Sequence, residues 1–291
     1  MSLIKTIQDI KSLKIQGAEN VSTKALESIK AQIKKTNART NIELFMELER
    51  SKQLLSNTRP TEPQLRNYLN AIQVITKKDS KTTKQEILNK ITQLLKQKSE
   101  AKNKIINNGK KLIKKNSIIY THCHSSTVTS ILIAMKKNIK EVHNTETRPR
   151  YQGRITAKEL AKHKIKVIQF VDSQMLDAMK YSNLILIGAD AITEKGLYNK
   201  VGSEEIAYLA KEKKISFYSC ASLWKFDFKE EKIEERSDQE VWAHHPKNIQ
   251  IENAAFDLIP LKLIKGIVCE KGILTPKEFI KEAKKVIYVN P

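Results

Sequence analysis

The chain has 291 residues, of which 40% are hydrophobic, and this supplies enough apolar side chains for one large or two ordinary domains. Its net charge of +21 is extreme, whereas its three cysteines, Cys123, Cys220 and Cys269, stand far apart without a Cys-x-x-Cys pair. The sequence therefore indicates neither a disulfide framework nor a zinc site, and it favours a reducing compartment. No apolar run approaches the roughly 18 residues of a membrane span, so we expect a cytoplasmic protein that does not engage a membrane.

The positive charge is concentrated at the N-terminus, where residues 1–115 hold 25 Lys+Arg against 10 Asp+Glu. Such a field could attract nucleic acid, an acidic protein or a phosphorylated ligand. Most of these residues are lysines, however, while base readout and bidentate phosphate binding favour arginine. The most basic stretch, from Thr83 to Lys115, also contains no interleaved aromatic residues. The pattern therefore argues against nucleic acid as a partner and favours a solvated basic surface.

Residues 1–115 read as a basic helical domain. Apolar residues recur at spacings of three and four from Ile29 to Leu55, and again from Ile87 to Leu95. The two prolines of Thr58–Pro63 interrupt this pattern, and the stretch from Thr83 to Lys115 predicts one long helix.

Residues 116–291 predict an α/β domain with a Rossmann-like, doubly wound parallel sheet. Short apolar runs typical of buried parallel strands occupy residues 118–120, 142–144, 167–171, 184–187, 215–218 and 267–269. Helical stretches at residues 127–138, 157–163 and 203–213 separate them. Ligands in such sheets bind at the carboxyl ends of the strands, so the residues that follow each run are the candidate site.

Polar residues follow three of these strands. Cys123 follows the first strand and precedes a helix that begins near Thr127, so the helix dipole is expected to stabilise its thiolate. Ser125 could cap that helix or hold an anion. Arginines follow the second strand at positions 148, 150 and 154, and Gly188-Ala189-Asp190 follows the fourth, with Asn199 and Lys200 further on. A carboxylate and a lysine at one sheet edge suggest acid/base chemistry beside an anionic group.

Each of these features also has a structural explanation. A lone cysteine is usually a small buried apolar residue, and an arginine cluster can be ordinary surface charge. His122 and His124 flank Cys123, but in an extended segment their side chains would point away from it. No third residue is spaced to complete a metal site, and Cys220 and Cys269 lie in apolar runs expected to be core.

Together these motifs resemble one family, which comprises ribose 1,5-bisphosphate isomerases, methylthioribose 1-phosphate isomerases and the alpha, beta and delta subunits of translation initiation factor 2B. The resemblance covers almost the whole chain and is nearest to archaeal ribose 1,5-bisphosphate isomerases. The motifs that carry it are Ile15–Ala18, Thr58–Thr61, Thr121–Cys123, Glu146–Pro149, Gln152–Gly153, Gly188–Asp190, Asn199–Gly202, Trp224–Phe226, Pro246–Asn248 and Asn253–Asp257.

The resemblance implies that Cys123 and Asp190 are the catalytic pair of an aldose–ketose isomerase. The aspartate would assist ring opening, after which a proton moves between carbons 2 and 1 through an enol-type intermediate. No metal and no organic cofactor are implied. The candidate substrate-binding residues are Gly17, Ala18, Arg59, Ser125, Arg148, Gln152, Gly153, Asn199, Lys200 and Lys225.

One motif departs from the family pattern. The isomerases carry an arginine where Gln16 stands, and Glu19 adds a negative charge near the expected phosphate site, which counts against bisphosphate binding. The leading hypothesis is an isomerase that converts ribose 1,5-bisphosphate to ribulose 1,5-bisphosphate in nucleotide salvage and AMP metabolism. The alternative is a factor 2B-like regulatory subunit that binds a sugar phosphate or nucleotide and contacts initiation factor 2. The family also implies a homodimer or homohexamer and leaves a nucleotide activator open.

Overall fold

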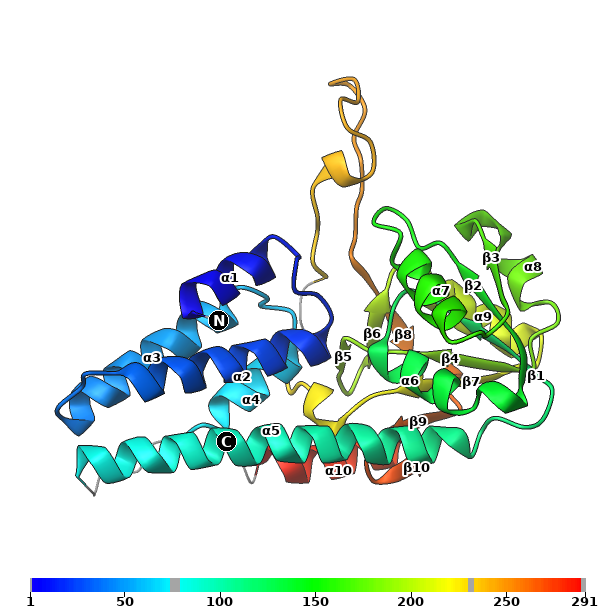
Figure 1. The fold of residues 1–291 in the computed structure, drawn as a ribbon. Helices are drawn as coiled ribbons and strands as arrows, with labels where there is room; N and C mark the ends of the chain where they lie inside the picture. The colour runs from blue at the N-terminus through cyan, green and yellow to red at the C-terminus, as the bar shows by residue number, and fades with distance from the viewer. Residues whose placement is uncertain (1, 74–78, 230–232, 289–291) are drawn as a thin grey trace. The chain divides into compact units, whose positions relative to one another are not determined.

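The computed structural model describes residues 2–73, 79–229 and 233–288. The chain divides into two compact units, shown with their elements in Figure 1. The helical unit comprises Met1–Ala101, Trp224–Phe226 and Ala283–Pro291, and the α/β unit comprises Lys102–Leu223 and Asp227–Glu282. The division after Ala101 falls inside a long helix, whereas the sequence analysis placed the domain boundary after Lys115.

The helical unit is built from amphipathic helices around one apolar core. Ile29, Leu48 and Tyr68 are among its almost fully buried side chains. A capping box between Thr40 and Glu43 starts the third helix, and Pro63 occupies the first turn of the fourth, where its missing N–H costs nothing. The helices are α1 (Leu3–Lys11), α2 (Ala18–Lys35), α3 (Asn41–Ser56), α4 (Pro63–Asn70) and the first part of α5 (Ser80–Lys110).

The α/β unit contains a seven-stranded sheet in the order β10-β9-β7-β4-β1-β2-β3, in which only β10 runs antiparallel to its neighbour. The predicted strands are confirmed as β1 (Ser117–Thr121), β2 (Ile139–Thr145), β3 (Val167–Phe170), β4 (Leu184–Ile187), β7 (Ser216–Cys220) and β9 (Gly266–Cys269). The sequence analysis did not foresee β10 (Gly272–Leu274) or α10 (Pro276–Tyr288).

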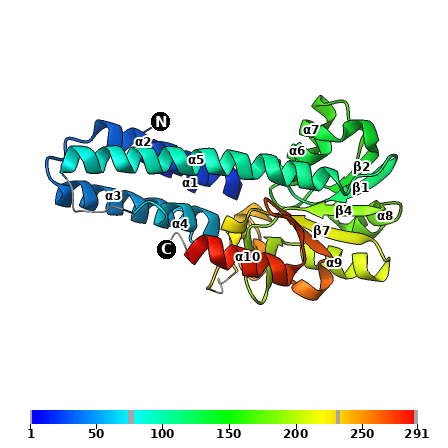
Figure 2. The ribbon, with the colours of Figure 1, turned by 90° about the horizontal axis from the view of Figure 1, so that it is seen from below.

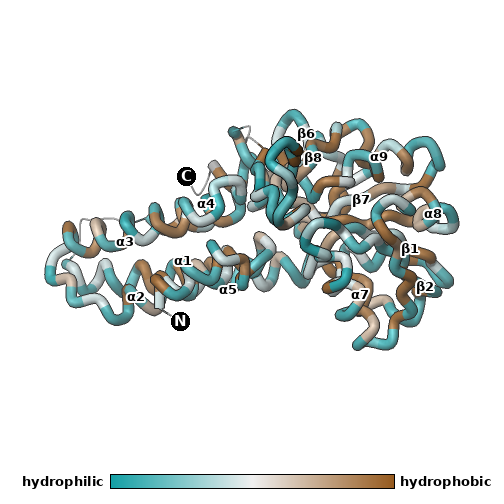
Figure 3. Tube along the Cα trace, turned by 90° about the horizontal axis from the view of Figure 1, so that it is seen from above, coloured by the Kyte–Doolittle hydropathy of each residue, from teal (hydrophilic) through white to brown (hydrophobic). Residues whose placement is uncertain are grey.

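Helices lie on both faces of this sheet, as a doubly wound arrangement requires. In Figure 2, α6 (Ser126–Ala134) and α7 (Gln152–Lys162) lie on one face, and α9 (Ser203–Glu212) lies on the other. The short α8 (Met175–Met179) packs against β2 and β3. Figure 3 shows hydrophobic colouring at β1, and the apolar core of this unit includes Ile119 on β1, Val142 on β2 and Leu186 on β4. Single-turn 3-10 helices occupy Lys136–Asn138, Asp172–Gln174, Leu223–Lys225, Asp238–Glu240 and Leu261–Leu263.

A second, three-stranded sheet has the order β5-β6-β8 and also belongs to the α/β unit. It consists of β5 (Ala191–Ile192), β6 (Gly196–Lys200) and β8 (Phe256–Pro260), all paired antiparallel. This sheet was not expected from the sequence, and it places Asn199 and Lys200 on a strand rather than in a loop.

The seven-stranded sheet reverses its winding between β1 and β4, because β1 continues to β2 and β3 on one side while β4 continues to β7 on the other. Ligands of doubly wound sheets bind at such a switch point, beyond the carboxyl ends of the strands. Cys123 follows β1 and Asp190 follows β4, so the two expected catalytic residues flank this position. Within the described residues, no helix is both long and apolar enough to cross a membrane.

Candidate active site

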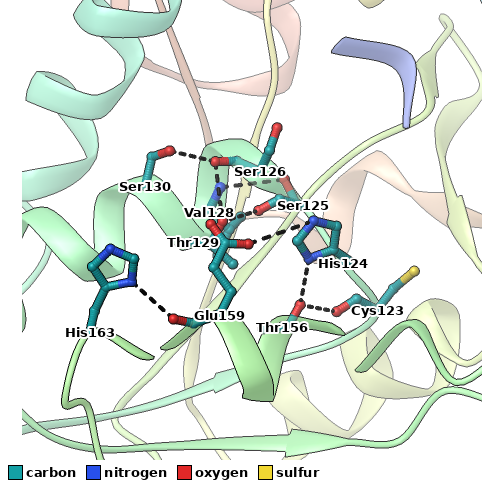
Figure 4. Close-up of polar contacts among 10 residues, drawn as sticks. All are labelled: Cys123, His124, Ser125, Ser126, Val128, Thr129, Ser130, Thr156, Glu159 and His163. Carbon is teal, nitrogen blue, oxygen red and sulfur yellow. Dashed lines mark hydrogen bonds and ion pairs between the residues drawn. The ribbon is translucent and has the colours of Figure 1, made fainter. Parts of the chain in front are cut away.

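Cys123 stands in a constrained backbone conformation at the end of β1. Its φ of 61° lies in the left-handed region, which is rare for residues with a side chain. Two threonine hydroxyls hold it there. The Cys123 N–H donates to Thr147 Oγ1 at 3.1 Å, and Thr156 Oγ1 donates to the Cys123 carbonyl at 2.8 Å. The loop after β2 and helix α7 therefore both hold the backbone of Cys123. Figure 4 shows its carbonyl oxygen at the Thr156 hydroxyl and its sulfur pointing away from Thr156.

The two histidines beside Cys123 bond to other parts of the α/β unit. His122 Nδ1 lies 2.9 Å from Thr145 Oγ1, and His122 Nε2 lies 2.9 Å from the Val201 carbonyl oxygen. His124 Nδ1 lies 3.0 Å from Thr156 Oγ1 (Figure 4). Because the Thr156 hydroxyl gives its proton to the Cys123 carbonyl, His124 Nδ1 must be the donor in that contact.

Burial of the Cys123 thiol, reinforced by the negative charge of Asp190, raises its pKa to about 12. The positive charges of Lys200 and Arg236 act in the opposite direction but are weaker. Burial therefore works against the thiolate that the helix dipole was expected to stabilise. Helix α6 begins three residues beyond Cys123, at Ser126, and its first-turn dipole does not outweigh desolvation. In the ligand-free protein Cys123 is a thiol and can donate a proton.

Asp190 is held at the start of the second sheet, where its N–H donates to the Tyr198 carbonyl at 2.8 Å. Gly188 just before it permits close packing, since a Cβ there would lie 3.0 Å from the Ser125 side chain and 3.9 Å from Asn199 Oδ1. Ser125 also caps α6 by accepting from the Val128 N–H (Figure 4). The structure thus brings Ser125, Asn199 and the Gly188–Asp190 segment together beside Cys123.

Lys200 is almost fully buried, with 4% of its surface exposed. Its ammonium group has no hydrogen-bond partner among the residues described. Burial lowers the pKa of Lys200, while the negative forms of Cys123, Glu240 and Asp190 oppose that effect. A buried cation without a hydrogen-bonded partner is costly, and an anionic ligand would relieve that cost.

Arg236 is a site residue that sequence reasoning missed. Its charge acts on both Cys123 and Lys200, and its side chain is only 11% exposed. The backbone N–H of Arg236 donates to the Asn253 carbonyl at 3.0 Å, and its Nε donates to Glu234 Oε1 at 3.2 Å. In the sequence, Glu234-Glu235-Arg236 resembles any solvated charge run, so no local signal could have singled it out.

The loop after β2 contains the arginines expected to bind an anion, and each of them already has partners. Arg148 donates to the Tyr151 hydroxyl and the Val241 carbonyl, both at 2.8 Å. Arg150 pairs with Glu240 at 2.7 Å, and Arg154 pairs with Glu146 at 2.6 Å. These contacts use only some of the five N–H donors of each guanidinium, so the remaining donors could still bind an anion.

Gln152 and Gly153 open helix α7 directly after this loop. A buried side-chain oxygen of Gln152, Oε1, lacks a hydrogen-bond partner among the described residues. A Cβ on Gly153 would lie 1.8 Å from the Thr145 carbonyl oxygen, so a glycine is required for α7 to approach β2. The carbonyl of Gly153 also accepts from Asn144 Nδ2 at 2.7 Å.

Three candidate residues lie on the body of the helical unit. Gly17 has a φ of 78° and is the N-cap of α2, and Ala18 is the first helical residue. Arg59 is 7% exposed and pairs with the buried Glu62 at 3.0 Å.

The structure also explains how the departure at Glu19 is accommodated. Glu19 Oε2 forms an ion pair with the buried Lys98 Nζ at 2.7 Å and accepts a hydrogen bond from Gln64 Nε2 at 3.1 Å. Burial opposes ionisation of Glu19, but the Lys98 ammonium and these hydrogen bonds outweigh it, so the pKa of Glu19 is lowered. The extra negative charge is therefore balanced within the helical unit itself.

Lys225, the fourth candidate of this unit, is held by its two neighbours. Trp224 stacks on Tyr68 with ring centroids 4.3 Å apart, and Asn67 Nδ2 donates to the carbonyls of Trp224 and Phe226 at 2.9 Å. The charge of Lys225 helps to lower the pKa of Glu19. The Trp224–Phe226 motif thus fixes a lysine to helix α4.

The fold and the site together define a class of protein. It is a mixed α/β protein with a thiol and a carboxylate at the switch point of a mostly parallel sheet. Residues 14–276 match the Initiation factor 2 subunit family, and the chain belongs to it, which confirms the resemblance seen in the sequence.

Named relatives include both enzymes and translation factors. The chain is 35% identical to ribose 1,5-bisphosphate isomerase of Pyrococcus furiosus, over 92% of this chain and 89% of the relative. Two crystal structures from Pyrococcus horikoshii, each 26% identical, have similar folds. One is described as translation initiation factor eIF-2B, with a TM-score of 0.84 and coverage of 96% of this chain and 98% of that one. The other is 5-methylthioribose 1-phosphate isomerase, with a TM-score of 0.83 and coverage of 98% and 88%.

Proposed function

We propose that the protein is an aldose–ketose isomerase that converts ribose 1,5-bisphosphate to ribulose 1,5-bisphosphate. The observation that carries this proposal is the placement of Cys123 and Asp190 after the two strands of the switch point, with the charge of Asp190 acting on the Cys123 thiol. The relative from Pyrococcus furiosus that bears the name of this activity supports the choice of substrate.

The reaction needs one acid and one base, and this pair can provide both. As the bond between carbon 1 and the ring oxygen breaks, that oxygen gains a proton, and carbon 2 loses its hydrogen as a proton. Carbon 1 then regains a proton and the carbon 2 hydroxyl loses one, so the isomerisation leaves no net change in protons. The ligand-free protein holds the proton of the pair on Cys123, whose pKa is about 12, while Asp190 bears the negative charge that helps to raise it.

Cationic groups beside the pair suit a phosphorylated substrate. Lys200 is buried beside Cys123 and Asp190, and the charge of Arg236 reaches Lys200 as well. We propose that Lys200 binds a substrate phosphate or the oxygen that becomes negative in the enol-type intermediate. The other proposed substrate-binding residues come from both units. They are Ser125, Arg148, Gln152, Gly153 and Asn199 of the α/β unit, and Gly17, Ala18, Arg59 and Lys225 of the helical unit.

The remaining features of the proposal concern the whole protein. They are a helical N-terminal domain followed by a Rossmann-like domain, a cytoplasmic location and a homodimeric or homohexameric assembly. A nucleotide activator such as AMP is part of the same proposal. Light scattering of the purified protein would give the assembly, and a monomer at micromolar concentration would contradict that part of the proposal.

The decisive assay incubates the purified protein with ribose 1,5-bisphosphate, with and without AMP, and identifies the product by NMR. Methylthioribose 1-phosphate is run in parallel. Formation of ribulose 1,5-bisphosphate supports the proposal, and turnover of the methylthio sugar alone would change the assigned substrate. If neither sugar turns over, the alternative of a factor 2B-like subunit that contacts initiation factor 2 takes its place.

A further inference from the structure

The ring of His122 joins the two sheets of the α/β unit. His122 follows β1 of the seven-stranded sheet, and its Nε2 lies 2.9 Å from the carbonyl of Val201, which directly follows β6 of the three-stranded sheet. The side chain is 2% exposed, so this contact is shielded from water. Cys123 is the next residue on one side of the contact, and Lys200 precedes Val201 on the other.

The partners of the ring fix its tautomer. A carbonyl oxygen has no proton to give, so Nε2 must donate to Val201. Burial lowers the pKa of His122, which leaves Nδ1 to accept from the Thr145 hydroxyl at 2.9 Å. Thr145 Oγ1 in turn lies 3.3 Å from the Tyr120 hydroxyl, which can supply its proton. The buried series from Tyr120 through Thr145 to His122 thus ends with an N–H directed at Val201.

The turn that His122 contacts is itself well ordered. The Val201 N–H donates to the Ala255 carbonyl at 3.2 Å, and the Gly202 N–H donates to Asp257 Oδ2 at 2.7 Å. Gly202 has a φ of 97°, and a Cβ on it would lie 3.3 Å from His122 Nε2. A glycine there satisfies the backbone conformation and leaves room for the imidazole. The contacts from Ala255, which directly precedes β8, and from Asp257 on β8 fix the turn within the small sheet, while His122 fixes it to the strand that leads to Cys123.

We propose that His122 is a positioning residue, which sets the distance between Cys123 and Lys200 by donating Nε2–H to the Val201 carbonyl. The proposal rests on the isomerase function proposed above for its kinetic consequences. His122 does not exchange protons with the substrate. It holds the Cys123 thiol and the Lys200 ammonium at a fixed distance from one another. A displacement of about 1 Å between such groups can lower the rate about 100-fold.

Two substitutions separate the roles of the two ring nitrogens. A His122→Gln side chain is long enough to place an amide N–H where Nε2 stands, so it can retain the bond to Val201. A His122→Asn side chain reaches only as far as Nδ1 and can bond to Thr145 but not to Val201. We expect His122→Asn to lower kcat by about 100-fold, and His122→Gln to recover most of that loss.

The chain offers a matched control in His143. It lies on β2 beside Tyr120, is 3% exposed, and donates Nδ1–H to the Ala178 carbonyl at 2.8 Å. His143→Asn removes a buried histidine from the same sheet without touching Val201, so it is expected to lower thermal stability and leave kcat nearly unchanged. An equal loss of kcat in His143→Asn, or an equal loss in His122→Gln and His122→Asn, would overturn the proposal.

Amide hydrogen exchange tests the contact without requiring any turnover. Loss of the Val201 bond should speed exchange in residues 200–206 by about tenfold in His122→Asn but not in His122→Gln or His143→Asn. If the unsubstituted protein turns over neither sugar phosphate, the proposed function fails, and the exchange rates alone decide the role of His122. Unchanged exchange in residues 200–206 of His122→Asn would refute it in either case.

Discussion

Alkylation of Cys123 offers a sharp test because only the thiolate reacts with iodoacetamide. A thiol with the ordinary pKa of 9.0 is ionised to about one part in ten at pH 8, whereas a pKa of about 12 leaves about one part in ten thousand. We therefore expect Cys123 to react about a thousand times more slowly than an exposed cysteine. Mass spectrometry of the peptide that contains Cys123 gives its rate separately from those of Cys220 and Cys269, and the protein unfolded in urea supplies the reference.

The pH dependence of this rate and one substitution identify the cause. The rate should continue to rise with pH well beyond 9, and Asp190→Asn should increase it at pH 8 by removing the negative charge that raises the thiol pKa. A folded protein that reacts like the urea reference, or a rate that reaches its plateau near pH 9, would refute the raised pKa of the Cys123 thiol. An unchanged rate in Asp190→Asn would mean that the two groups are not coupled.

Three further perturbations follow from the buried charges. Lys200→Met should raise the unfolding free energy by about 1–3 kcal/mol, because it removes a buried cation that lacks a hydrogen bond. The same substitution should abolish turnover. A variant that is less stable in urea than the unsubstituted protein would contradict the stability prediction. Glu19→Gln should lower the unfolding free energy by about 2 kcal/mol, because it removes the carboxylate charge that pairs with the buried Lys98 ammonium. An unchanged urea midpoint would show that the pair does not stabilise the helical unit. Burial lowers the pKa of His122 and of His124 below 6.5, so the unfolded chain binds more protons and stability should fall as the pH drops below about 6.5. Urea titrations at pH 7 and 5 should show a smaller loss in His122→Gln, and an equal loss in both proteins would contradict the contribution of His122.

The parallel sheet could be predicted because buried parallel strands are nearly continuous apolar runs, as in Leu184–Ile187. The three-stranded sheet could not. Its β5 has two residues, and β6 contains Asn199 and Lys200, polar side chains that are buried only because the tertiary structure surrounds them. Sequence periodicity reports local alternation and carries no information on such long-range burial.

The positions of Cys123 and Asp190 beside one another could also be anticipated, because carboxyl ends of neighbouring parallel strands meet at one sheet edge. The protonation of Cys123 could not, since desolvation depends on residues distant in sequence. For the same reason no sequence pattern indicated that His122 contacts Val201, which is 79 residues away.

The most direct test of the account measures conversion of ribose 1,5-bisphosphate by the unsubstituted protein, Cys123→Ala and Cys220→Ala under identical conditions. Cys220 lies on β7, is 1% exposed and belongs to the apolar core, so it controls for the loss of a thiol as such. The account predicts ribulose 1,5-bisphosphate from the unsubstituted protein and Cys220→Ala, and none from Cys123→Ala. Product formation by Cys123→Ala at a rate near that of Cys220→Ala would contradict it.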